Sequence, residues 1–115
     1  MISDLHHVSI NVDDLAAAEH FYVDILGLER LPRPDFGIGG LWLGAGERQV
    51  HLIELPAVPD DLGQHFAFRV SDLDATIAHL KDHGIATEDV FESPVGRQVA
   101  LHDPCGNRVE LNQPN

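Results

Sequence analysis

The fold of this chain is decided by a stretch near its amino terminus, Leu5-His6-His7-Val8-Ser9-Ile10-Asn11-Val12. Polar and apolar residues alternate along it, which is typical of a half-buried β-strand. The apolar positions share one face of this strand, whereas His7, Ser9 and Asn11 share the other. A second stretch, Gln64-His65-Phe66-Ala67-Phe68-Arg69-Val70, repeats the alternation. The sequence therefore predicts two equivalent strands, each with a histidine near its start.

The repeat extends into the segments that follow the two strands. Val12-Asp13-Asp14-Leu15 opens a helix in the first copy, and Val70-Ser71-Asp72-Leu73 opens one in the second. The separation of 58 residues from His7 to His65 is also the separation from Asp14 to Asp72. The chain is therefore an internal duplication that keeps one histidine at the same place in both copies.

Each copy continues from its helix into three further predicted strands. Gly27 and Gly84 end the two helices, and strands follow at 28–31, 36–43 and 49–54, then at 86–91, 97–102 and 107–112. The halves, of about residues 1–57 and 63–115, are thus two tandem βαβββ modules. We expect one domain of 115 residues with an α+β fold, in which a curved eight-stranded mixed sheet carries helices on its outer face.

Composition excludes several classes of partner. The net charge of −12 disfavours nucleic acid and anionic membranes, and no apolar run approaches the roughly 20 residues of a membrane span. The first residues lack the pattern of a secretory signal, and a single cysteine, Cys105, fits a reducing compartment. We expect a cytoplasmic protein without nucleic-acid or membrane partners.

The duplication also predicts a cluster of possible metal ligands. The last strands of the halves share the patterns Val50-His51-Leu52 and Val109-Glu110-Leu111, whose apolar residues point to the core. His51 and Glu110 then point to the face that carries His7 and His65. Imidazole and carboxylate are ligands for borderline divalent metals. A lone histidine in a strand is more often a surface or hydrogen-bonded group, but four such groups at duplicate positions favour a metal site.

Other polar residues are weaker candidates. Ser9 shares a face with His7 and is expected to line a pocket, and Trp42 and Phe36 would supply an apolar wall or pack in the core. Arg97 would meet an anionic substrate or remain a solvated surface arginine. His79 and His83 lie one helical turn apart and could bind zinc, although a solvated helix face is the simpler interpretation.

The chain resembles the vicinal oxygen chelate superfamily, which includes glyoxalase I, bleomycin and fosfomycin resistance proteins, methylmalonyl-CoA epimerase and extradiol dioxygenases. Nearly the whole chain shares the likeness, which rests on three segments: 7–15, Phe21-Tyr22 through Leu26-Gly27-Leu28, and 103–111. The resemblance implies His7, His51, His65 and Glu110 as ligands of zinc, nickel, cobalt, iron or manganese. It also implies a homodimer, with a small substrate that offers two neighbouring oxygens to the metal.

The resemblance implies a lyase or isomerase of the glyoxalase type in which Glu110 transfers the proton. In glyoxalase I the ligand at the position of His51 is a glutamate, so one of two potential bases is missing here. An extradiol dioxygenase built on His7, His65 and Glu110 is one alternative. The other is a ligand-sequestering protein of the bleomycin-resistance type, without catalysis.

Overall fold

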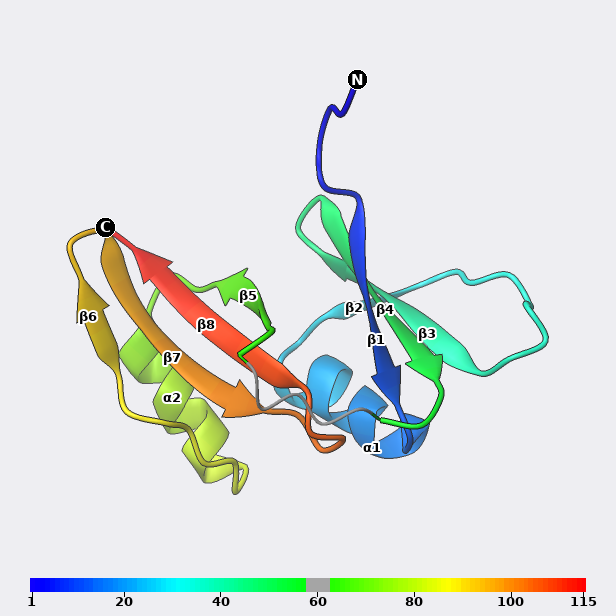
Figure 1. Ribbon diagram of the computed structural model, residues 1–115. Helices are drawn as coiled ribbons and strands as arrows, with labels where there is room; N and C mark the ends of the chain where they lie inside the picture. Colours follow the sequence, from blue (N-terminus) through cyan, green and yellow to red (C-terminus); the bar gives the residue numbers. More distant parts are fainter. Residues whose placement is uncertain (58–62) are drawn as a thin grey trace. The chain divides into compact units, whose positions relative to one another are not determined.

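The computed structural model describes residues 1–57 and 63–115, and the chain divides into two compact units, Met1–Pro59 and Asp60–Asn115 (Figure 1). Their organisation as one domain stays a prediction.

The first unit is a four-stranded mixed sheet with helical turns between its first two strands (Figure 1). Its elements are β1 (His7–Val12), α1 (Leu15–Glu19), η1 (His20–Ile25), β2 (Glu29–Leu31), β3 (Gly40–Ala45) and β4 (Arg48–Glu54). The strand order is β1-β4-β3-β2, with β1 parallel to β4 and the other pairs antiparallel. The unit is therefore the expected βαβββ module.

The second unit has the same topology. Its elements are β5 (Phe66–Arg69), α2 (Leu73–Asp82), β6 (Phe91–Ser93), β7 (Gly96–His102) and β8 (Arg108–Pro114). The strand order is β5-β8-β7-β6, with β5 parallel to β8, and α2 lies against one face of this sheet (Figure 1). The predicted α+β class and the duplication are confirmed, with the eight strands divided between two four-stranded sheets.

The helix ends follow the sequence prediction. The carboxylate of Asp14 accepts a hydrogen bond of 3.0 Å from the amide of Ala17, and Asp72 does the same for Ala75. Gly27 and Gly84 have φ angles of +80° and +75°, which glycine adopts without steric cost. The first helix differs from expectation because it widens into a π-helix at His20–Ile25. Phe21, Tyr22 and Ile25 are buried in this segment.

Several strands are shorter than predicted. β3 begins at Gly40 because Asp35 accepts a hydrogen bond from the amide of Gly37, whose φ is +77°, and holds a turn there. Residues 86–90 form no strand, and the amide of Glu88 makes a single bond of 2.8 Å to the carbonyl of Ala100. His65 precedes β5 and so lies outside the strand in which it was expected.

One face of each sheet is buried under its helical segment. Fully buried aliphatic side chains alternate along the central strands, namely Leu43, Val50 and Leu52 in the first unit and Val99, Leu101, Val109 and Leu111 in the second. The intervening residues, which include His51 and Glu110, belong to the opposite face. No helix among the described residues is long and apolar enough to span a membrane.

Candidate metal centre

His51 and Glu110 occupy corresponding positions in the two sheets. His51 in β4 lies opposite Ser9 in the parallel neighbour β1, and Glu110 in β8 lies opposite Ala67 in β5. Because Ser9 and Ala67 are themselves duplicate positions, the backbone register matches on both sides. Each candidate ligand of a central strand therefore has a candidate histidine close to the beginning of the adjacent strand, with His7 as the first residue of β1 and His65 directly before β5.

In the second unit, His65 and Glu110 approach each other directly. The distance from Nε2 of His65 to Oε1 of Glu110 is 3.4 Å. Nδ1 of His65 lies 2.7 Å from the carbonyl oxygen of Gly63, and it must donate the hydrogen because a carbonyl only accepts. In the neutral ring, Nε2 then carries the lone pair and faces the carboxylate.

This arrangement fits a divalent cation. An imidazole lone pair and a carboxylate oxygen that face each other are both electron-rich, so a cation or a proton between them relieves their repulsion. Two ligand atoms at about 2.1 Å from one metal, with an angle of 90–110° between the bonds, are about 3.0–3.4 Å apart. His65 and Glu110 match that spacing.

Two side-chain amides orient the Glu110 carboxylate, of which only 13% is exposed. Nε2 of Gln98 donates to Oε1 over 2.8 Å, and Nδ2 of Asn112 donates to Oε2 over 3.2 Å. Such partners fix the direction in which a ligand's lone pairs point. Both lie on the face of Glu110, with Asn112 two residues beyond it in β8 and Gln98 opposite Asn112 in β7.

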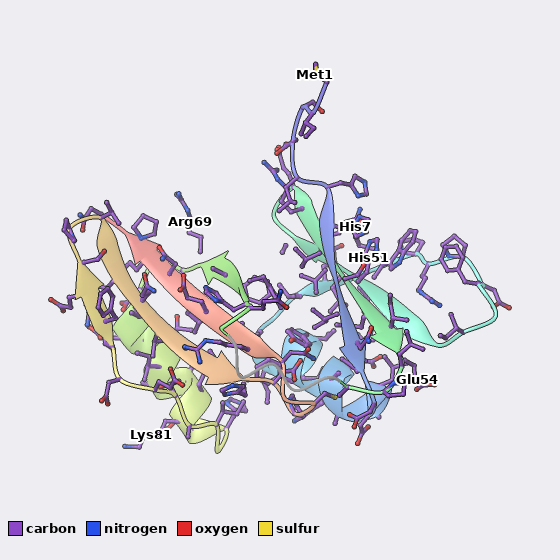
Figure 2. All side chains as sticks on the ribbon, in the orientation of Figure 1. Met1, His7, His51, Glu54, Arg69 and Lys81 are labelled. Carbon is purple, nitrogen blue, oxygen red and sulfur yellow. The ribbon has the colours of Figure 1, made fainter. Side chains whose placement is uncertain are left out.

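In the first unit, His7 and His51 are stacked rather than directed at a common point. Their ring centroids are 3.9 Å apart with an angle of 17° between the planes, and Figure 2 shows both side chains beside β1 and β4. Trp42 stacks on His51 at 4.5 Å and 10°. Nε2 of His51 lies 2.8 Å from Oε1 of Gln49, and His51 is only 8% exposed. A metal at His51 would use Nδ1 or displace Gln49.

The electrostatic surroundings keep His51 neutral. Burial lowers the pKa of His51 below the usual 6.5, and charge on His7, His6 and Arg33 lowers it further. Nδ1 of His6 and Nδ1 of His7 are 2.8 Å apart, so one of these nitrogens donates to the other. Neutral imidazole is the form that binds metal ions, so His51 has the protonation state of a ligand near pH 7.

Ser9, Trp42 and Phe36 share the first unit with this stack. Ser9 is opposite His51 in β1, and Trp42 is opposite His51 in β3. The ring of Phe36 lies 5.9 Å from Trp42, and the guanidinium of Arg33 lies 5.1 Å from the Phe36 ring. The structure thus gathers an apolar wall beside His51.

Arg97 belongs to the other face of its sheet. Its guanidinium makes two hydrogen bonds of 3.1 Å to Asp74 in α2 and a third to Glu92. The hydrogen bonding that Arg97 donates to the Asp74 carboxylate is the main cause of the raised pKa of Arg97. Gln98, the next residue of β7, points to Glu110 instead. Arg97 is therefore a surface arginine held by carboxylates, away from the sheet face that carries Glu110.

Sequence reasoning did not identify Gln49, Gln98 and Asn112. Gln49 and Asn112 lie two residues from His51 and Glu110 in the same strands, so strand periodicity already places them on the ligand face. Within residues 1–57 and 63–115, no group of three or more His, Cys, Asp or Glu side chains forms a ready metal site. Each unit by itself supplies a pair of candidate ligands.

The chain resembles known proteins along most of its length. Residues 4–111 match the family model described as Glyoxalase/Bleomycin resistance protein/Dioxygenase superfamily. YaeR, an uncharacterized protein of Escherichia coli K12, is 30% identical over 123 residues, covering 96% of this chain and 95% of YaeR.

Solved structures share the fold. A putative glyoxalase family protein from Bacillus anthracis superposes with a TM-score of 0.90 at 26% identity, covering 100% of this chain and 98% of that one. TnmS3, an antibiotic binding protein from Streptomyces sp. CB03234, gives a TM-score of 0.80 at 30% identity, with 99% and 98% covered. The similar proteins thus include one whose described role is binding.

Proposed function

Because the chain belongs to the Glyoxalase/Bleomycin resistance protein/Dioxygenase superfamily, we propose that it is a metal-dependent, glyoxalase-like enzyme of the lyase or isomerase type. Its substrate is a small molecule that offers two neighbouring oxygens. Its metal ligands are His7, His51, His65 and Glu110.

The approach of His65 to Glu110 is the observation that carries this proposal. Nε2 and Oε1 are 3.4 Å apart, the Gly63 carbonyl fixes the tautomer of His65, and Gln98 fixes the carboxylate. A cation between Nε2 and Oε1 accounts for the facing lone pairs, and the amide donors of Gln98 and Asn112 orient the carboxylate toward it. His7 and His51 complete the set by duplication.

The residues of this chain would divide the chemistry as follows. A divalent ion, when bound, acts as a Lewis acid toward the substrate oxygens. Glu110 is the base: Oε2, which accepts only the longer bond from Asn112, takes the proton from the substrate carbon and returns it. His65 binds through Nε2 and is kept in place by Gly63. Trp42 and Ser9 shape the pocket wall beside His51.

The resemblance supports three further elements of the proposal. The metal is zinc, nickel, cobalt, iron or manganese, all of which accept three imidazoles and one carboxylate. The protein acts as a homodimer, and its place is the cytoplasm. The metal and the dimer are tested on the purified full chain, and the location is tested in the cell that makes the protein.

The first experiment is elemental analysis of the purified protein, with the variants His65→Ala, Glu110→Ala and His51→Ala. Near-stoichiometric divalent metal that falls in all three variants supports a four-ligand site. Metal that falls in His65→Ala and Glu110→Ala but not in His51→Ala supports a three-ligand site and moves dioxygenase chemistry ahead. The matched controls are His102→Ala and Glu47→Ala, both exposed. No metal after reconstitution with each candidate ion overturns the enzyme proposal.

A second candidate function is the binding of a ligand without catalysis. It is favoured by 30% identity to the antibiotic binding protein TnmS3 and by the aromatic wall of Trp42 and Phe36, since Phe36 is 58% exposed. Stacking on such a wall suits flat, apolar ligands. A metal-free protein that retains such a ligand, and loses it in Phe36→Ala, would establish this function instead.

A further inference from the structure

The carboxyl end of α2 carries a second pair of histidines, on the exposed side of the helix. His79 lies in the last turn and His83 is the C-terminal cap residue, so the two histidines are four positions apart. Both side chains are exposed, and their ring centroids are 4.5 Å apart. Two histidines at this spacing on one helix face are a recognised way to hold zinc.

The hydrogen bonding of His83 fixes which nitrogen is available. Its Nδ1 lies 2.8 Å from the backbone carbonyl oxygen of His79, so Nδ1 donates the hydrogen. In the neutral ring Nε2 then keeps its lone pair and faces away from that bond. Metal-binding histidines commonly donate their other ring N–H to a backbone carbonyl in this way.

The angle between the rings also suits chelation. The planes of His79 and His83 are tilted by 52°, whereas those of His7 and His51 are almost parallel at 17°. Nitrogen lone pairs lie in the ring plane, so tilted rings can direct them to one point, while parallel rings direct them side by side. The tilt of the pair on α2 therefore permits a ring nitrogen of each histidine to reach one cation, which the parallel stack of His7 and His51 does not.

Charge favours a cation at this end of the helix. The last carbonyl groups of a helix give its carboxyl end a partial negative charge. The whole chain carries a net charge of −12, which raises the local concentration of cations. Lys81 lies between the two histidines in sequence, but a residue two positions away points to a different side of the helix.

We propose that His79 and His83 form a surface site for a borderline divalent cation such as Cu²⁺, Ni²⁺ or Zn²⁺, separate from the proposed metal centre. Two imidazole nitrogens bind the ion, and water fills its remaining positions. The site is independent of the proposed function because neither histidine belongs to that ligand set. At this site each chain binds one further metal ion, which is held more weakly than at the proposed metal centre and exchanges with solution.

The test is an amide ¹⁵N–¹H spectrum of the full chain titrated with Cu²⁺, which broadens signals near its binding site. In the Glu110→Ala variant, which lacks the proposed metal centre, we expect broadening at residues 79–84 at less than one equivalent of Cu²⁺, and in the wild type we expect it after the first equivalent. His79→Ala and His83→Ala should each weaken that binding at least tenfold, while His20→Ala and His102→Ala, exposed histidines elsewhere, leave it unchanged. Circular dichroism checks that the variants keep the fold.

Two results would overturn the site. One is broadening at 79–84 that persists in both alanine variants. The other is broadening there only at millimolar Cu²⁺, which marks adventitious binding. If His65→Ala and Glu110→Ala lose their metal while α2 keeps its own, the two sites are independent, as proposed. If His7, His51, His65 and Glu110 prove to bind no metal while α2 still binds Cu²⁺, the proposed function is overturned and the site on α2 stands.

Discussion

Nε2 of His65 and Oε1 of Glu110 face each other at 3.4 Å, each held from behind by a hydrogen bond of its own. His7 and His51, at the duplicate positions, are instead stacked on each other. The two halves thus contribute unequally: the second unit presents a pair with metal-ligand spacing, and the first presents a pair that must rearrange to bind.

Removing the amide that orients Glu110 should weaken metal binding without removing a ligand. We expect Gln98→Ala to lower the metal affinity about 10- to 100-fold, as is usual when a residue behind a ligand is lost. Competition with a chromophoric chelator measures this affinity, and Gln64→Ala, at an exposed position, is the control. In a Glu110→Ala background the effect of Gln98→Ala should vanish. An equal loss in both backgrounds would show that Gln98 does not act through Glu110.

The single tryptophan reports on the first unit. Trp42 stacks on His51 at 4.5 Å and is the chain's only tryptophan, so its fluorescence responds to a metal bound at that ring. We expect Cu²⁺ or Ni²⁺ to quench the emission of the wild type, and His51→Ala to abolish most of that quenching. The exposed His102→Ala variant serves as the control. Quenching that survives in His51→Ala would place the metal away from His51.

Equivalent core positions should contribute equally to stability. Leu52 and Leu111 flank His51 and Glu110, point to the buried face, and are 0% and 1% exposed. We expect Leu52→Ala and Leu111→Ala each to lower the free energy of unfolding by about 2–5 kcal/mol. Leu55→Ala, at a position 39% exposed, should cost about 1 kcal/mol or less. Urea denaturation gives the three values, and a small effect at either buried leucine would contradict the assigned face.

The lowered pKa of His51 predicts a loss of stability in mild acid. The unfolded chain binds a proton at His51 near pH 6.5, whereas the folded chain binds it only at lower pH. The stability due to neutral His51 is therefore complete above about pH 6.5 and is lost as the pH falls toward the lowered pKa. His51→Phe keeps a flat ring between His7 and Trp42 without a titrating group. We expect its urea midpoint to change less between pH 7.5 and 5.5 than that of the wild type, and an equal change would contradict the shift.

Much of the fold could be predicted because it depends on local patterns. The caps at Asp14 and Asp72 and the positive φ of Gly27 and Gly84 are properties of a few neighbouring residues. The π-helix at His20–Ile25 escaped prediction because the same apolar spacing fits an ordinary helix. The predicted strands at 36–39 and 86–90 were wrong, because single hydrogen bonds and turns take the place of regular hydrogen bonding between strands there.

The sequence by itself determined the duplication, the strand faces and the four candidate ligands, since alternation and repeat spacing depend only on the order of residues along the chain. Only the tertiary structure decided how each ligand is held. It stacks His51 between His7 and Trp42, brings the Gln98 amide to Glu110, and assigns Arg97 to the carboxylates of Asp74 and Glu92. These contacts join residues from different strands and helices, so their geometry depends on sheet register and side-chain packing rather than on any local pattern.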